Sequence, residues 1–159
     1  MLTVRLIVTG TLKEAYLKSA FEEYKKRLGA FCKFELIELK EYKLPDKPSD
    51  SEISKALAEE AKQIRPYLNP KAFKTALCIE GKTYASPEYA RKLSETEMRT
   101  GELDYIIGSA YGLDETLKAE ADERLSLSPM TFSHQLARIL FMEVLYRTFS
   151  IRNGGKYHK

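Results

Sequence analysis

The chain has 159 residues and a net charge of +3, with 43% hydrophobic and 31% charged residues, a composition typical of one globular domain. No apolar run approaches the ~20 residues of a membrane-spanning helix, and the N-terminus lacks the features of a signal peptide. Cys32 and Cys78 are expected to be reduced thiols, and two cysteines with two histidines make a zinc site improbable. We therefore expect a single domain, residues 1–159, that is cytoplasmic, without a membrane segment and without a metal.

The first half of the chain is predicted to alternate strands with helices, because short alternating runs are separated by longer amphipathic ones. The expected elements are a strand at 2–8, a helix at 13–28, a strand at 34–39 and a helix from 49 to about 68. Ser49 and Glu52 have the spacing of a capping box, which marks the start of the second helix.

The second half continues the alternation. The expected elements are a strand at 73–79, a helix from 86 to about 101, a strand at 103–108, a helix at 114–121, a strand at 125–128 and a helix at 133–151. Ser86 is expected to cap the first of these helices, with Pro87 in its first turn.

This order predicts an α/β fold with a mainly parallel sheet and helices on both faces. Ligands bind such sheets at the carboxyl ends of the strands. Three predicted strand ends carry unusual residues: 80–81, the glycine-containing 108–112 and the polar 128–133. We expect these three segments to converge on one site.

The last predicted helix has apolar residues almost all round, so it must be buried on most sides. Either it is the central helix of a monomer or it packs against a second chain, and we favour a dimer. Residues 144–159 contain Arg147, Arg152, Lys156 and Lys159 without an acidic residue. Such an end either binds phosphate or is simply solvated.

Several common motifs are excluded. Gly81-Lys82-Thr83 ends like a phosphate-binding loop, but position 76 is Ala where that loop needs Gly. The glycines at 108 and 112 do not make a dinucleotide-binding fingerprint, and no nucleophile elbow is present. The residues alone thus indicate a strand-end pocket and a basic, aromatic tail, without identifying the reaction.

The order of motifs along the whole chain resembles the SPOUT-class ribosomal RNA large-subunit methyltransferase H family. The residues that carry the resemblance are 4–10, Leu77-Cys78-Ile79-Glu80-Gly81-Lys82, Ile106 to Leu113, Ser126-Leu127-Ser128 through Thr131, His134, Arg138, Glu143, Tyr146-Arg147, Ile151 and the terminal Tyr157-His158-Lys159.

The resemblance implies a C-terminal trefoil knot within about residues 73–159, a homodimer, and S-adenosylmethionine as the cofactor. It further implies N3-methylation of a pseudouridine in helix 69 of 23S rRNA, on assembled ribosomes. By position, the cofactor contacts would be Leu77, Gly108, Leu127, Ser128, Pro129, Met130, Thr131 and Phe132.

For catalysis, His158 is the candidate base by residue type, with solvent as its rival, and Arg147 is a second candidate. Arg138, Tyr157 and Lys159 would contact RNA. Two alternatives remain open: a non-catalytic module that binds RNA or the ribosome, and a SPOUT methyltransferase that acts on another RNA.

One position departs from the family. The family usually has two glycines after the fourth strand, and here the second is Ser109. A Cβ atom at this position is expected to crowd the methionine part of the cofactor or to require a different backbone angle.

Overall fold

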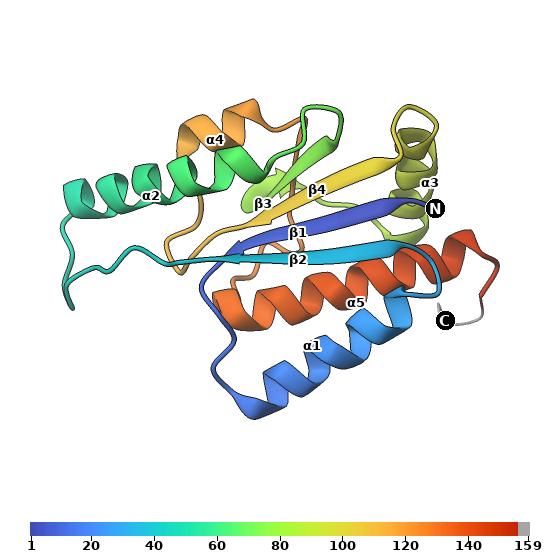
Figure 1. Ribbon diagram of the computed structural model, residues 1–159, viewed down its shortest axis with the longest axis horizontal. Helices are drawn as coiled ribbons and strands as arrows, with labels where there is room; N and C mark the ends of the chain where they lie inside the picture. The colour runs from blue at the N-terminus through green and yellow to red at the C-terminus, as the bar shows by residue number, and fades with distance from the viewer. Residues whose placement is uncertain (156–159) are drawn as a thin grey trace.

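The strands form one five-stranded parallel sheet in the order β2-β1-β4-β3-β5, in a computed structural model that describes residues 1–155 (Figure 1). The elements are β1 Thr3–Thr9, α1 Ala15–Leu28, β2 Lys33–Leu39, α2 Asp50–Ile64, a 3-10 turn Arg65–Tyr67, β3 Phe73–Lys82, α3 Ser86–Glu97, β4 Glu102–Ile107, α4 Glu115–Glu120, β5 Glu123–Leu125 and α5 His134–Arg152. The predicted parallel α/β architecture is therefore confirmed.

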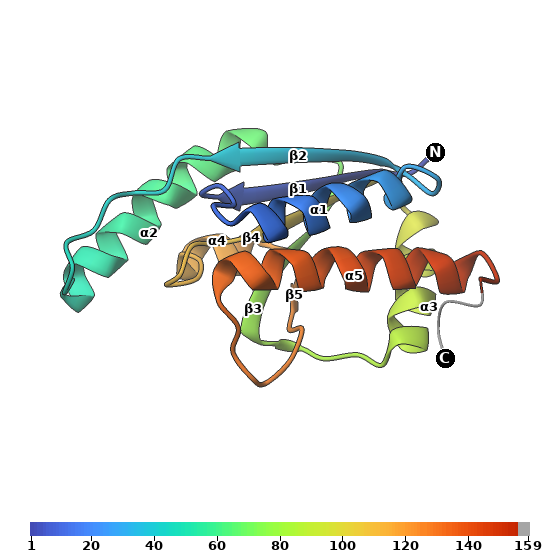
Figure 2. The same ribbon diagram turned by 90° about the horizontal axis from the view of Figure 1, so that it is seen from below.

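The helices cover both faces of the sheet, as the alternation predicted. Helices α1, α3 and α5 lie on one face, and α2 and α4 lie on the other (Figures 1 and 2). Successive residues of a strand point to opposite faces. Accordingly, Leu6 of β1 packs in the core with α1 and α5, whereas its neighbour Ile7 packs with α2 and α4.

Side-chain caps fix where three of the helices begin. Ser49 and Glu52 form the predicted capping box of α2, with hydrogen bonds of 3.2 and 3.1 Å. Asp114 caps α4, and Ser133 caps α5 by accepting a hydrogen bond from the Leu136 N–H. The predicted cap of α3 is wrong, because Ser86 is already helical and Ala85 is the N-cap residue.

The fifth strand is shorter than predicted and ends at Leu125 rather than at 128. Strand β3 extends to Lys82, and its pairing with β5 is irregular between Leu77 and Lys82. A Cβ atom on Gly81 would lie 2.6 Å from the Leu125 carbonyl carbon, so only glycine permits this close approach. Residues 126–132 therefore leave the sheet as a loop.

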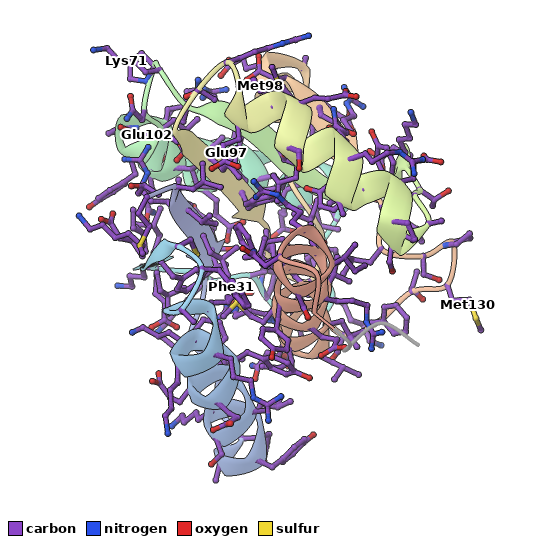
Figure 3. The ribbon with its side chains drawn as sticks, turned by 90° about the vertical axis from the view of Figure 1, so that its right-hand side faces the viewer. Phe31, Lys71, Glu97, Met98, Glu102 and Met130 are labelled. Carbon is purple, nitrogen blue, oxygen red and sulfur yellow. The ribbon has the colours of Figure 1, made fainter. Side chains whose placement is uncertain are left out.

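Helix α5 is buried largely by its own chain. It packs between α1 and α3, and Phe31 stacks on Phe149 with ring centroids 5.9 Å apart, filling the space between α1 and α5 (Figure 3). The apolar stripe left at least partly open is Leu136, Leu140 and Val144. Most of the apolar surface of α5 is thus covered within its own chain, and this stripe remains available to contact another.

Within residues 1–155, no helix is long and apolar enough to cross a bilayer. In the same range, no group of three acidic, thiol or imidazole side chains is arranged as a metal site would be.

Candidate functional site

A cavity of about 680 Å³ lies at the carboxyl ends of β3, β4 and β5. Its walls are the end of β3 with Glu80, the loop 108–112 after β4, and the loop 126–132 after β5, closed by the first turn of α5 at His134. The predicted convergence of three strand ends on one site is therefore confirmed. The volume falls within the ~300–1,000 Å³ range of small-molecule sites.

The loop after β4 is shaped by its two glycines. A Cβ atom on Gly108 would lie only 2.0 Å from the carbonyl oxygen of Gly112, so the loop can close on itself only with glycine at 108. Gly112 has φ of +87°, and its N–H donates to the Ser109 carbonyl at 2.9 Å. The result is a tight turn whose backbone forms one wall of the cavity.

The loop after β5 is held by its own serines. The Ser126 hydroxyl donates to the carbonyl of Ser128 at 3.1 Å, and the Ser128 hydroxyl accepts from the N–H of Met130 at 3.0 Å. Met130 is 76% exposed and projects away from the body of the molecule (Figure 3). The same loop therefore lines the cavity and presents apolar side chains outward.

A buried lysine joins two walls of the cavity. Lys118 Nζ of α4 donates to Glu80 at 2.5 Å and contacts Glu115 at 2.7 Å. Burial opposes the charged form of Lys118, but the hydrogen bonds to Glu115 and Glu80 outweigh it and raise its pKa. The hydrogen bond from Lys118 in turn lowers the pKa of Glu80, so both partners carry charge at neutral pH.

Most of the residues predicted to contact a cofactor lie in this cavity. They are Leu77, Gly108, Leu127, Ser128, Met130, Thr131 and Phe132. Pro129 does not line it. The cavity is also lined by residues of α4 and of the start of α5 that were not predicted to contact the cofactor, among them Asp114, Lys118 and His134. The helix-cap signal at Asp114 could have placed the first of these beside the strand end.

Ser109 adopts an ordinary backbone conformation, since all described residues with positive φ are glycines. Its side chain is buried, and its hydroxyl donates to Oε1 of Glu60 at 3.1 Å. The hydroxyl is thus engaged by α2.

Arg138, predicted to contact RNA, is only 1% exposed. Its guanidinium forms an ion pair with Glu38 at 3.1 Å and donates to the Gly10 carbonyl at 3.0 Å. A guanidinium enclosed in this way has no face open to a nucleic acid, so its assignment to RNA binding is wrong. Its role is to tie α5 to the ends of β1 and β2.

The structure does not bring Arg147 to the cavity of its own chain. Arg147 lies 13 residues beyond His134 on α5, a separation of about 20 Å along the helix axis, and it pairs with Glu143 at 3.0 Å. Tyr157, His158 and Lys159 lie outside the described residues.

Comparisons with known proteins agree with the resemblance carried by the sequence motifs. A family model described as predicted SPOUT methyltransferase matches residues 2–158. Proteins named ribosomal RNA large subunit methyltransferase H from Streptococcus equi subsp. zooepidemicus and Streptococcus pneumoniae are each 41% identical over 157 residues, covering 98% of this chain and 99% of theirs.

Two solved structures share the fold. A probable methylase family protein from Haemophilus influenzae matches with a TM-score of 0.59 at 15% identity, over 98% of this chain and 70% of that one. A probable methyltransferase from Bordetella pertussis matches with a TM-score of 0.55 at 20% identity, over 92% and 95%. Together with the cavity at the strand ends, the family match over nearly the whole chain shows that the protein belongs to the SPOUT methyltransferases.

Proposed function

We propose that this protein transfers a methyl group from S-adenosylmethionine to N3 of a pseudouridine in helix 69 of 23S rRNA, on assembled ribosomes in the cytoplasm. The observation that carries the proposal is the cavity built from the loops 108–112 and 126–132, in a chain 41% identical to proteins named ribosomal RNA large subunit methyltransferase H. The match to the SPOUT methyltransferase family model over residues 2–158 supports a trefoil knot within residues 73–159 of a single domain.

The residues of the cavity fit this cofactor. Leu77 and Leu127 offer apolar surface for an adenine ring. The carboxylates of Glu80 and Asp114 also line the cavity, and hydrogen bonds from Lys118 and Thr116 respectively lower their pKa values. Both are therefore anionic at neutral pH, but Lys118 neutralises the charge of Glu80, so Asp114 is the carboxylate that favours a ligand with sulfonium and ammonium charges.

When bound, S-adenosylmethionine supplies a methyl group on a sulfonium that leaves as a neutral thioether. The protein then needs no covalent nucleophile, and its task is to hold the methyl carbon and the base nitrogen in line. The rigid turn at Gly108 and the serine-braced loop 126–130 are suited to that task. The proton on N3 must also leave, and we propose His158 as the group that accepts it.

The length of α5 supports a site made by two chains. The Gly155 N–H donates to the Ser150 carbonyl at 2.7 Å, so the tail starts beside Ser150, about 24 Å along α5 from His134. His158 is three residues further on, a reach of roughly 11 Å at full extension. This reach is shorter than the stretch of α5 between Ser150 and His134, which supports a site completed by the tail of a second chain. We propose that His158, Tyr157, Lys159 and Arg147 act at the cavity of the other chain of a homodimer.

Two measurements test the proposal. Calorimetry should show S-adenosylmethionine binding to the purified protein, and tritium from labelled cofactor should appear in 23S rRNA when ribosomes are the substrate. Deletion of residues 157–159 should leave cofactor affinity nearly unchanged and abolish transfer. Cofactor binding without transfer to ribosomes, but with transfer to another RNA, would instead identify a SPOUT enzyme of different substrate. Ribosome binding without cofactor binding would identify a non-catalytic module.

Mixed dimers test whether the site is shared. A chain lacking residues 157–159 is co-expressed with a full-length chain whose cavity is blocked by Leu127→Glu, and the mixed dimer is isolated with two different affinity tags. Each homodimer should be inactive. The mixed dimer should recover one working site, because the full-length tail reaches the intact cavity of the truncated chain. An inactive mixed dimer would argue against a composite site.

A further inference from the structure

A second cavity of about 700 Å³ lies beside the first, at the carboxyl ends of β1 and β2. The two cavities share three residues, Leu57, Ser109 and Tyr111. Both lie at the carboxyl ends of the strands, the end of the sheet toward which the strand arrows of Figure 1 point. The second cavity is therefore also at a position where parallel sheets bind ligands. The proposed methyl transfer leaves this second cavity without a role.

The wall between the two cavities is held by a buried carboxylate. Glu60 of α2 is 4% exposed, and its Oε1 accepts from the Ser109 hydroxyl at 3.1 Å. Its Oε2 accepts from the N–H of Tyr42 at 3.0 Å. One side chain thus fixes the loop after β4 relative to the segment that follows β2. The second cavity has a braced wall rather than a gap between mobile loops.

The charges around the second cavity favour an anion. Lys13, Lys40 and Lys43 line it, are exposed, and form no ion pair with any residue in the described range 1–155. Two acidic side chains of the lining are engaged within the protein: Glu38 pairs with Arg138, and Glu60 holds the wall. Of the acidic residues that line this cavity, Glu41 alone is left to oppose the three lysine ammonium groups.

The shared wall also carries an aromatic surface. Tyr111 lines both cavities and is 49% exposed. Nucleic-acid bases stack on exposed aromatic rings, and nearby lysines bind the phosphates of the same strand. A tyrosine that lines the same cavity as three unpaired lysines, one wall away from the proposed methyl donor, has the composition of a single-stranded nucleic-acid site.

We propose that the second cavity binds a nucleotide of the RNA substrate that neighbours the methylated one. The base stacks on Tyr111, and Lys40 and Lys43 contact the adjoining phosphates. The wall at Ser109 sets the spacing between this nucleotide and the cofactor. The proposal rests on the proposed function, since it assumes an RNA substrate that approaches the first cavity.

The test compares two double charge reversals. Lys40→Glu/Lys43→Glu alters the cavity, and Lys26→Glu/Lys71→Glu makes the same change of net charge at exposed residues near the opposite edge of the sheet. Binding of bacterial 70S ribosomes is measured directly, and S-adenosylmethionine binding is measured by calorimetry. We expect at least a tenfold loss of ribosome affinity for the first variant, less than twofold for the second, and equal cofactor affinity for both.

Two further readouts sharpen the result. The slope of log affinity against log salt should fall by roughly 1.5 for the cavity variant, as expected for two lost phosphate contacts. Glu41→Gln should bind ribosomes two- to threefold more tightly, because it removes the one opposing charge. Equal losses in both double variants, or an unchanged affinity in the cavity variant, would overturn the proposal.

Binding is read separately from methyl transfer so that the two proposals can fail separately. A wild-type protein that methylates ribosomes, together with a cavity variant that binds them normally, would refute the second cavity alone. A wild-type protein that methylates no ribosome, with a cavity variant that still loses ribosome affinity selectively, would refute the proposed reaction and leave the second cavity in place.

Discussion

The guanidinium of Arg138 and the carboxylate of Glu38, 3.1 Å apart, join the first turns of α5 to the carboxyl end of β2. The same guanidinium donates to the carbonyl of Gly10, where β1 ends. Burial lowers the pKa of Arg138, and the charge and hydrogen bond of Glu38 oppose that shift. The pair therefore holds the helix that closes the first cavity against the strands that border the second.

Arg138→Ala should lower the free energy of unfolding by roughly 2–4 kcal/mol, because it leaves Glu38 and two carbonyls without their buried donor. Urea denaturation followed by circular dichroism measures this change. Lys62→Ala, which breaks an exposed pair with Glu59 on α2, is the control and should leave stability nearly unchanged. A stable Arg138→Ala protein that binds RNA poorly would restore Arg138 as an RNA contact.

Ser109→Ala should lower the free energy of unfolding by about 1–2 kcal/mol, since Glu60 then lacks one of its two hydrogen-bond donors. Ser109→Gly should cost more, because it also frees the backbone of the loop after β4. Thermal or urea unfolding gives both values. Cofactor affinity in Ser109→Ala should stay within about threefold of wild type, by calorimetry. A glycine variant that is more stable than wild type would show that the serine is merely tolerated.

Leu140→Asp should convert the proposed dimer to a monomer, because each chain would place a charge in the stripe formed by Leu136, Leu140 and Val144. Burying one such leucine contributes about 1.5–3 kcal/mol, and a dimer with twofold symmetry loses two. Light scattering at micromolar concentration measures the mass. Leu136→Asp repeats the test at a more exposed position, and Met98→Asp, at the residue that follows α3, is the control expected to remain dimeric. A wild-type monomer at the same concentration would contradict the proposed dimer.

The stability of Glu60→Gln relative to wild type should rise as the pH increases above about 4.5. Burial raises the pKa of Glu60 above 4.5, and the hydrogen bonds from Tyr42 and Ser109 only partly offset the shift. The unfolded chain therefore releases this proton at a lower pH than the folded one, so folding loses free energy between the two pKa values. Urea unfolding at several pH values from 4 to 8 measures the difference. A difference that stays constant across this range would show that Glu60 titrates normally.

The sheet could be predicted because its signals are local. Strand runs of period two, amphipathic helices and a capping box at Ser49 each depend on residues close in sequence. The convergence of strand ends followed from parallel topology alone. The limit of such local signals explains why Arg138 was wrongly assigned to RNA binding. On a helix buried nearly all round, spacing does not reveal whether a polar position faces solvent or the ends of distant strands.

Other parts of the site left no local signal. The end of β5 at Leu125 depends on the close approach of Gly81, a contact between segments more than 40 residues apart in the sequence. The second cavity depends on Glu60 reaching both Tyr42 and Ser109. A glutamate within an amphipathic helix gives no indication of either partner, because such residues are usually solvated.

The place of β1 in the sheet has a consequence for biosynthesis. Thr3 pairs with Lys33 on one side and with Glu102 on the other, so β1 has no second neighbour until β4 has been made. Helix α5, which covers one face of the sheet, follows all five strands in the sequence. Until then, a nascent chain carries an open strand edge and an uncovered apolar face, both of which promote aggregation. The fold is therefore completed only after β4 and α5 have both been made, and the partly made chain is the form most exposed to aggregation.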